Sequence, residues 1–148
     1  MKVIIQRVSG ANVKVNNETI AQINQGFLLL VGFTHSDNQL IVEKVVKKII
    51  GLRIFEDNNG KINLAIHEVN GAILSVPQFT LYGNVKKGNR PSFINSAKAD
   101  DAKNLYLYFN QCLEAYNIEI ATGIFQADMQ VSLVNDGPVT IIIDSSEL

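Results

Sequence analysis

Apolar positions alternate with polar ones in many short stretches of the chain and repeat at helical spacing in two longer stretches. Period-two or continuous apolar segments predict strands at residues 2–8, 13–15, 20–23, 27–33, 53–56, 61–64, 72–81, 118–122, 128–134 and 139–143. One helix is predicted to begin at Ser36, with Gln39 as its capping-box partner, and to end at Gly51. The other is predicted from about Asp100 to Tyr116.

The connections between these segments carry further information. Asn16-Asn17 and residues 57–60 (Asp-Asn-Asn-Gly) predict hairpin turns, because Asn and Gly tolerate positive φ. Residues 135–140 lie between the last two predicted strands, and on their own pattern they are most simply a hairpin turn in which Pro138 opens an edge strand. Residues 83–99 show almost no periodicity, and so long a loop in a compact domain is usually functional or disordered.

Strands therefore dominate, and two helices are available to cover one face of a sheet. The fold class predicted is α/β: one strand-rich domain over residues 1–148, with a mainly antiparallel or mixed sheet paired mostly by hairpins. Residues 27–33 are apolar on both faces, so they form either a central strand or a strand whose second face meets a partner. With the similar stretch 139–143, they lead us to expect a homodimer formed through the sheet.

Composition narrows the class of protein. The chain has 148 residues, of which 47% are hydrophobic and 18% charged, which fits one folded domain and argues against a disordered chain. Its formal net charge of −1 means that a nucleic-acid partner would have to meet a local basic patch. We see neither a signal peptide nor a membrane-spanning stretch, so a soluble, cytoplasmic protein without a membrane partner is expected.

Conventional catalytic side chains are scarce. His35 and His67 stand in separate loops, and the single cysteine, Cys112, lies on the apolar stripe of the second helix. We therefore expect no metal and no cofactor, and we interpret Cys112 as a small hydrophobic residue. The sequence also has no glycine-rich phosphate loop and no G-x-S-x-G motif.

Three segments remain as candidate functional sites, each with a simpler alternative. In residues 75–83, Gln78 and Thr80 could line the mouth of a pocket, with Thr80 as a hydrogen-bond donor or nucleophile, although this could be an ordinary strand end. Residues 135–140 form the second candidate, with the hairpin turn as the alternative. The third is the loop with three cations (Lys86, Lys87 and Arg90), which could grip phosphates or could be merely solvated.

Several short motifs in this order and spacing identify a family. They are Gln6-Arg7-Val8, Arg53-Ile54-Phe55, Gln78-Phe79-Thr80-Leu81, Asn89-Arg90-Pro91-Ser92-Phe93, Thr122-Gly123 and Asn135-Asp136-Gly137-Pro138-Val139-Thr140. Each is weak alone, and together they are highly specific. From Met1 to about Ile143, the chain resembles the D-aminoacyl-tRNA deacylases.

The resemblance implies a homodimer with two active sites, each built across the interface. The segment Gln78-Phe79-Thr80 would form the pocket floor and position the ester through main-chain groups. A cis Gly137-Pro138 dipeptide from the other subunit would exclude L-side chains by steric clash, so that only D-aminoacyl and glycyl groups enter. Arg7 matches the arginine that holds this dipeptide in place. The expected partner is aminoacyl-tRNA and not DNA, and the substrate's own 2′-hydroxyl would assist hydrolysis.

Pro77 departs from the family pattern, which usually has Ser before the Gln. Proline lacks both the hydroxyl and the backbone N–H, so any role of that serine in orienting the pocket is lost. A related deacylase group with relaxed chirality carries Pro-Gln here, with a trans Gly-Pro bond, and is the alternative on substrate range. The other alternative is a catalytically silent, tRNA-binding dimer.

Overall fold

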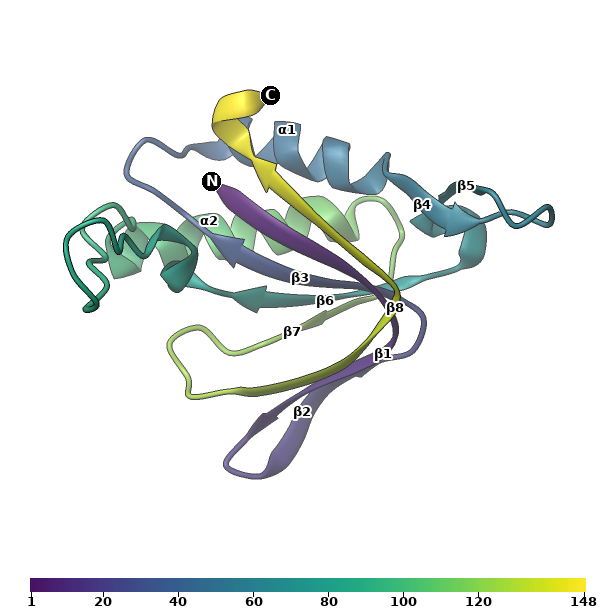
Figure 1. Cartoon of the computed structure of the whole chain (residues 1–148), viewed down its shortest axis with the longest axis horizontal. Coiled ribbons are helices and arrows are strands. Elements are labelled where there is room, and N and C mark those ends of the chain that lie inside the picture. The colour runs from purple at the N-terminus through teal and green to yellow at the C-terminus, as the bar shows by residue number, and fades with distance from the viewer.

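A mixed sheet with two helices packed on one face organises the computed structural model, which describes residues 1–148 (Figure 1). The strands are β1 (Lys2–Val15), β2 (Glu18–Ile23), β3 (Gly26–Gly32), β4 (Arg53–Glu56), β5 (Ile62–Ala65), β6 (Ala72–Pro77), β7 (Ile120–Thr122) and β8 (Gln130–Asp144). The helices are α1 (Gln39–Ile50) and α2 (Ala99–Glu114), with single 3₁₀ turns η1 (Ile66–Val69), η2 (Phe79–Tyr82) and η3 (Ser145–Glu147). Neither α1 nor α2 combines the length and apolar character needed to cross a membrane.

The six-stranded sheet has the order β2-β1-β3-β6-β7, and β8 pairs with the other edge of β1. β1 is antiparallel to β2, β3 and β8, whereas β3, β6 and β7 are parallel to one another. The prediction that strands pair mostly by hairpins is therefore wrong for this half of the sheet. α1 lies between β3 and β6 in the chain and α2 between β6 and β7, and crossover connections of this kind join parallel strands.

Two apolar cores hold the sheet. The larger lies between the helices and the sheet and includes Val3, Ile5, Phe27, Leu29 and Ile73. The smaller lies where the curved sheet closes on itself, around residues such as Val8, Val13, Leu28 and Leu74. β3 contributes alternately to both cores, which explains why residues 27–33 are apolar on both faces. It is a central strand, buried within this chain, so it no longer argues for a partner.

Several predicted boundaries need correction. α1 begins at Gln39 and not at Ser36, because Asn38 is its N-cap and accepts a hydrogen bond from the Ile41 backbone N–H at 3.1 Å. Residues 2–8 and 13–15 belong to one long strand, and the Asn16-Asn17 turn that follows has the positive φ expected of it. The strand predicted over residues 72–81 ends at Pro77, which has no N–H to continue a ladder.

The largest difference lies at the C-terminal end. Residues 128–134 and 139–143 are not two strands joined by a hairpin turn; they belong to the single strand β8, which pairs with β1 along both halves. Gln6 lies opposite Thr140 and Val8 opposite Asn135, so residues 136–139 bulge out opposite Arg7 alone. A bulge of this kind interrupts the ladder without ending the strand. The Gly137–Pro138 bond within it is cis, as the resemblance implied.

Candidate active site

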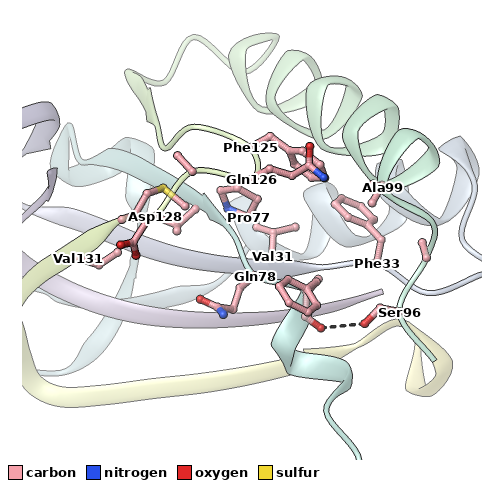
Figure 2. Close-up of a pocket in the computed structure, with 17 residues that line it drawn as sticks. Val31, Phe33, Pro77, Gln78, Ser96, Ala99, Phe125, Gln126, Asp128 and Val131 are labelled. Atoms are coloured by element: carbon pink, nitrogen blue, oxygen red, sulfur yellow. Dashed lines mark hydrogen bonds between the residues drawn. The ribbon is translucent and has the colours of Figure 1, made fainter. Parts of the chain in front are cut away.

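A cleft of about 620 Å³ opens at the carboxyl ends of the parallel strands β3 and β6 (Figure 2). Crevices at this end of parallel strands are the usual ligand sites of open α/β sheets. Seventeen residues line it: Val31, Gly32, Phe33, Val76, Pro77, Gln78, Phe79, Ser96, Ala97, Ala99, Ala102, Phe125, Gln126, Ala127, Asp128, Met129 and Val131. Most of them are apolar, so the cleft suits the side chain of a small ligand better than a chain of charged groups.

The floor of the cleft is set by the way β6 ends. Beyond Pro77, the Gln78 backbone N–H donates to the carbonyl of Val31 at 2.7 Å and returns the chain to β3. The Gln78 side-chain amide donates to the Thr80 hydroxyl at the start of η2. Gly32 is required here because a Cβ at this position would lie 2.8 Å from the Gln78 carbonyl oxygen. Of the three residues predicted for the pocket floor, Gln78 and Phe79 line this cleft, and Thr80 lies beside them, outside its lining.

The loop of residues 83–98, hereafter the basic loop, is held firmly against this floor. Phe93 packs edge-on against Phe79 with ring centroids 5.0 Å apart, and the Ser96 hydroxyl donates to the Phe79 carbonyl at 3.0 Å. Asn84 and Ser92 exchange two backbone hydrogen bonds of 2.8 and 2.9 Å at the base of the loop tip. The cations Lys86, Lys87 and Arg90 are all exposed on this tip and do not line the cleft.

Buried Arg7 fastens the bulge of β8 to the body of the domain. Its side chain is 5% exposed. Nη1 donates to the Ile54 carbonyl at 2.6 Å, and Nε donates to the Asp136 carbonyl at 3.0 Å. Gly137 has a φ of +127°, and a Cβ there would lie 2.8 Å from Val139 Cγ2 and 3.0 Å from Arg7 Nη2. A glycine is therefore needed at this position, and Gly137 and Pro138 stay exposed at the tip of the bulge.

One chain does not bring the two halves of the expected site together. In the pairing of β1 with β3, Lys2 lies opposite Gly32 beside the cleft, whereas Arg7 lies opposite Phe27. Five residues of strand separate these positions, or about 17 Å at the usual rise of a strand. Gly137 and Pro138, which face Arg7, accordingly do not line the cleft of their own chain.

A buried tyrosine supports the cleft from α2. The Tyr106 hydroxyl donates to the Ser75 carbonyl at 2.8 Å, and the same carbonyl accepts the Gly123 backbone N–H at 2.8 Å. Burial raises the pKa of the Tyr106 phenol, although its hydrogen bond to Ser75 opposes the shift. Burial also raises the pKa of the Cys112 thiol on the same helix, which agrees with its interpretation as a small hydrophobic residue.

Sequence reasoning missed the far wall of the cleft. This wall is the connection between β7 and β8, which supplies Phe125, Gln126 and Asp128. Gln126 has a φ of +63°, so the connection turns sharply at the cleft. No periodicity marks these residues, and the only available signal was their position just after the family-like Thr122-Gly123 pair.

The chain shares this architecture with known proteins. A structure named as a c-Myc DNA unwinding element binding protein is 39% identical and superposes with a TM-score of 0.91 over 97% of this chain and 98% of that one. A second structure, named as a probable eukaryotic D-amino acid tRNA deacylase, has a TM-score of 0.82 over 96% and 97% of the two chains; at 18% identity it shows the fold alone.

Sequence comparison is more specific. D-aminoacyl-tRNA deacylase of Lactobacillus gasseri is 54% identical over 97% of this chain and 99% of its own length. The corresponding protein of Thermosipho africanus is 49% identical over 100% and 99%. The family model for D-Tyr-tRNA(Tyr) deacylase matches residues 4–144.

Fold, cleft and comparisons together define an aminoacyl-tRNA hydrolase with a single α/β domain and a mixed sheet. In particular, the chain belongs to the D-Tyr-tRNA(Tyr) deacylase family, whose curated relatives are D-aminoacyl-tRNA deacylases. The resemblance drawn from the sequence motifs is confirmed.

Proposed function

We propose that this chain, acting as one deacylase domain over its whole length, hydrolyses D-aminoacyl-tRNA and glycyl-tRNA and spares L-aminoacyl-tRNA. In this proposal Gly137 and Pro138 of a second copy enter the cleft beside Gln78. The observation that carries it is the separation of the two half-sites: each is exposed, yet about 17 Å of strand keeps them apart within one chain. A backbone segment in the cleft discriminates by steric clash and needs no recognition of a particular side chain.

An apolar face next to the cleft supports the dimer. On the side of the sheet away from the helices, Ile142 lies opposite Ile4, which in turn lies opposite Leu30. Ile142 is 69% exposed, and β8 is an edge strand whose outer side pairs with nothing in this chain. A second copy covering this face would bury the apolar row and bring its own β8, with the bulge, toward the cleft.

The chemistry expected of the cleft relies little on acidic or basic side chains. Gln78 and Thr80 offer an amide and a hydroxyl already bonded to each other, and the surrounding positions offer main-chain groups. We therefore infer that the substrate's 2′-hydroxyl assists the attack of water on the ester carbonyl, which releases the amino acid and the tRNA hydroxyl, with Gln78, Phe79 and Thr80 positioning the ester. A Thr80→Ala variant should keep substantial activity, and tRNA ending in 2′-deoxyadenosine should be nearly inert. A loss near the ~10⁶-fold of a deleted nucleophile would make Thr80 the nucleophile instead.

The basic loop is proposed to hold the acceptor end of tRNA. Lys86, Lys87 and Arg90 form no ion pair within the chain, and they project from a loop fixed against the cleft floor. Replacing all three with Ala should weaken tRNA binding and reduce its salt dependence by about one unit of slope per lost phosphate contact. An unchanged slope would assign the loop to solvent, and equal affinity for a DNA hairpin would contradict the expectation that DNA is not a partner.

Mixing two inactive variants tests the shared site directly. Gly137→Asp should remove the contribution of the bulge, and Phe79→Ala should damage the cleft of its own chain. If each site combines a cleft with the bulge of the partner, the two variants refolded together should regain about a quarter of wild-type activity on D-Tyr-tRNA, because half of the dimers carry one intact site. No recovery would place the bulge and the cleft in the same chain.

Assays of the wild-type protein on four aminoacyl-tRNAs test the proposed substrate range. Wild-type protein should hydrolyse D-Tyr-tRNA and glycyl-tRNA and leave L-Tyr-tRNA and L-Ala-tRNA intact. Cleavage of L-Ala-tRNA would favour the chirality-relaxed alternative raised by Pro77. Tight tRNA binding without hydrolysis of any of these substrates would favour the silent tRNA-binding dimer.

A further inference from the structure

The bulge of β8 leaves the ladder with β1 after Asn135 and returns to it at Thr140. Asn135 lies opposite Val8 and Thr140 opposite Gln6, and these two residues of β8 form the neck of the bulge. β8 bends sharply between its two paired halves (Figure 1). Because only Arg7 lies opposite the bulge, the ladder supplies few of the contacts that fix its shape, and side chains have to supply the others.

The side chain of Asn135 supplies such contacts at the neck. Its Nδ2 donates to the Thr140 hydroxyl at 2.8 Å, and its Oδ1 accepts the Val139 backbone N–H at 3.1 Å. Pro138 has no N–H, so Val139 offers the first backbone donor after the tip of the bulge. One half-buried amide therefore holds the returning chain and bridges the two sides of the neck.

The two arms of the bulge are attached at different places. Arg7 Nε donates to the Asp136 carbonyl before the tip, whereas Asn135 accepts from Val139 after it. Only the tip, Gly137-Pro138, lies between these two attachments. A functional group has to be held to within about 0.5 Å of its working position, so a wall that acts by steric clash depends on both attachments.

We propose that Asn135 is a positioning residue for chiral selection, which closes the neck of the bulge and so holds the tip where an L-side chain would clash. This rests on the proposed function, in which the tip enters the cleft of a second copy. A loosened tip can move away from a side chain that it would otherwise exclude, whereas D-aminoacyl and glycyl groups do not meet it. Asn135 acts through the backbone of the bulge and takes no part in the hydrolysis itself.

Amide exchange tests these hydrogen bonds without any measurement of activity. In Asn135→Ala the Val139 N–H loses its acceptor, so by NMR it should exchange with solvent about fivefold faster than in wild type. In Asn135→Asp the carboxylate can accept from both Val139 N–H and the Thr140 hydroxyl, so exchange should stay near the wild-type rate. Unchanged exchange in Asn135→Ala would overturn the proposal.

Hydrolysis of three substrates separates positioning from general damage. In Asn135→Ala, the ratio of kcat/KM for L-Tyr-tRNA to that for glycyl-tRNA or D-Tyr-tRNA should rise about tenfold, because two hydrogen bonds are lost. Thr140→Val loses only the bond across the neck and should raise the ratio less, while Asn135→Asp should restore the wild-type value. Equal losses on all three substrates would show a merely structural role, and the proposal would fail.

A matched control removes a similar hydrogen bond elsewhere. Asn38 Oδ1 accepts the Ile41 backbone N–H at 3.1 Å, the same distance as in the bond from Val139 to Asn135. Loss of this N-cap in Asn38→Ala should lower the midpoint of urea unfolding and keep the wild-type ratios of the three substrates. If the ratios changed equally in this variant, loss of stability alone would explain the effect of Asn135→Ala, and the proposal would be wrong.

Mixed dimers assign the effect to one chain. When Phe79→Ala and Gly137→Asp are refolded together, the intact site combines the cleft of the Gly137→Asp chain with the bulge of the Phe79→Ala chain. Asn135→Ala added to the Phe79→Ala chain should therefore raise the relative rate on L-Tyr-tRNA, and added to the other chain it should not; equal effects would overturn the proposal. No recovery in the parent mixture would mean that the proposed function fails, while the exchange of Val139 would still decide whether Asn135 holds the bulge.

Discussion

Substitution of Arg7 tests whether its hydrogen bonds hold the Gly137–Pro138 bulge in place. Because its guanidinium donates to the Ile54 and Asp136 carbonyls from a nearly buried position, Arg7→Ala leaves one buried acceptor unpaired and frees the bulge. We expect a less stable protein that also discriminates less well between D- and L-Tyr-tRNA, because Gly137 follows Asp136 directly. Arg7→Lys should be intermediate, since an ammonium lacks the planar fork that reaches both carbonyls.

The magnitude follows from the two hydrogen bonds. A bond to a charged group contributes about 1.5–3 kcal/mol, so the pair sets an upper bound of about 6 kcal/mol. The Asp136 carbonyl lies on an exposed bulge where water can replace Nε, whereas the Ile54 carbonyl is bonded in the interior. A loss of about 3 kcal/mol in the free energy of unfolding is therefore expected for Arg7→Ala. With typical domain stabilities of about 5–15 kcal/mol, the variant should still fold and can be assayed.

Asp136→Asn is the matched control. Its carboxylate is 54% exposed and lies 3.7 Å from Arg7 Nε, so the ion pair should contribute less than about 1 kcal/mol, while the backbone carbonyl remains in place. Urea unfolding of the three variants, followed by circular dichroism, measures the ranking. The reasoning would be refuted if Arg7→Ala were no less stable than Asp136→Asn, or if it lost 3 kcal/mol yet kept the wild-type ratio of D- to L-Tyr-tRNA hydrolysis.

Three further substitutions probe other parts of the molecule. Gly137→Ala places a Cβ against Val139 at a positive φ, so it should keep the helix content seen by circular dichroism and lose most activity on D-Tyr-tRNA; full activity would contradict the need for glycine there. Ile142→Glu should yield a monomer of about 16 kDa by light scattering with little activity, and an active monomer would remove the basis of the shared site. Tyr106→Phe loses the hydroxyl bond to Ser75 and should cost about 1 kcal/mol near neutral pH. Because the folded-state pKa of Tyr106 is raised, this advantage of wild type should persist below its unfolded pKa of about 10 and shrink as pH rises further; a pH-independent difference would contradict it.

Local patterns predicted the strands and helices well, because burial on one face imposes a period that the sequence displays. The turn at Asn16-Asn17 before β2 and the hairpin around residues 57–60 were also predicted correctly, because Asn and Gly tolerate the positive φ of tight turns. The pairing of the strands was harder to predict from the sequence. Whether β3 meets β6 in parallel depends on where α1 returns the chain, and no residue in either strand reports that direction. The bulge in β8 was missed because Pro138 and Gly137 are also good turn residues, and only the pairing with β1 separates a bulge from a turn.

The parts of the candidate site also differ in how far the sequence could predict them. Gln78 and Gly137 were proposed from recognisable motifs, whereas the connection between β7 and β8 was missed as a wall of the cleft, because so short a connection has no pattern of its own. Its place at the cleft depends on the way β3, β6, α2 and this connection come together in the fold. Which connection forms the wall of a cleft is a property of the fold, and it is not written in the residues of the connection.

In the proposed dimer, one strand would carry both the interface and the selectivity element. In a twofold interface, each patch on one copy meets its counterpart on the other, so a segment that reaches the partner's cleft must lie on or beside the surface that joins the copies. β8 satisfies this condition: Ile142 lies on its exposed apolar side, and the Gly137–Pro138 bulge lies four residues earlier on the same edge strand. Arg7 belongs to β1, the strand that pairs with β8 along its length, and so ties the bulge to this neighbouring strand. Dimerisation and chiral selection should therefore fail together when β8 is displaced, whereas substitutions confined to the basic loop should weaken tRNA binding and leave chirality untouched.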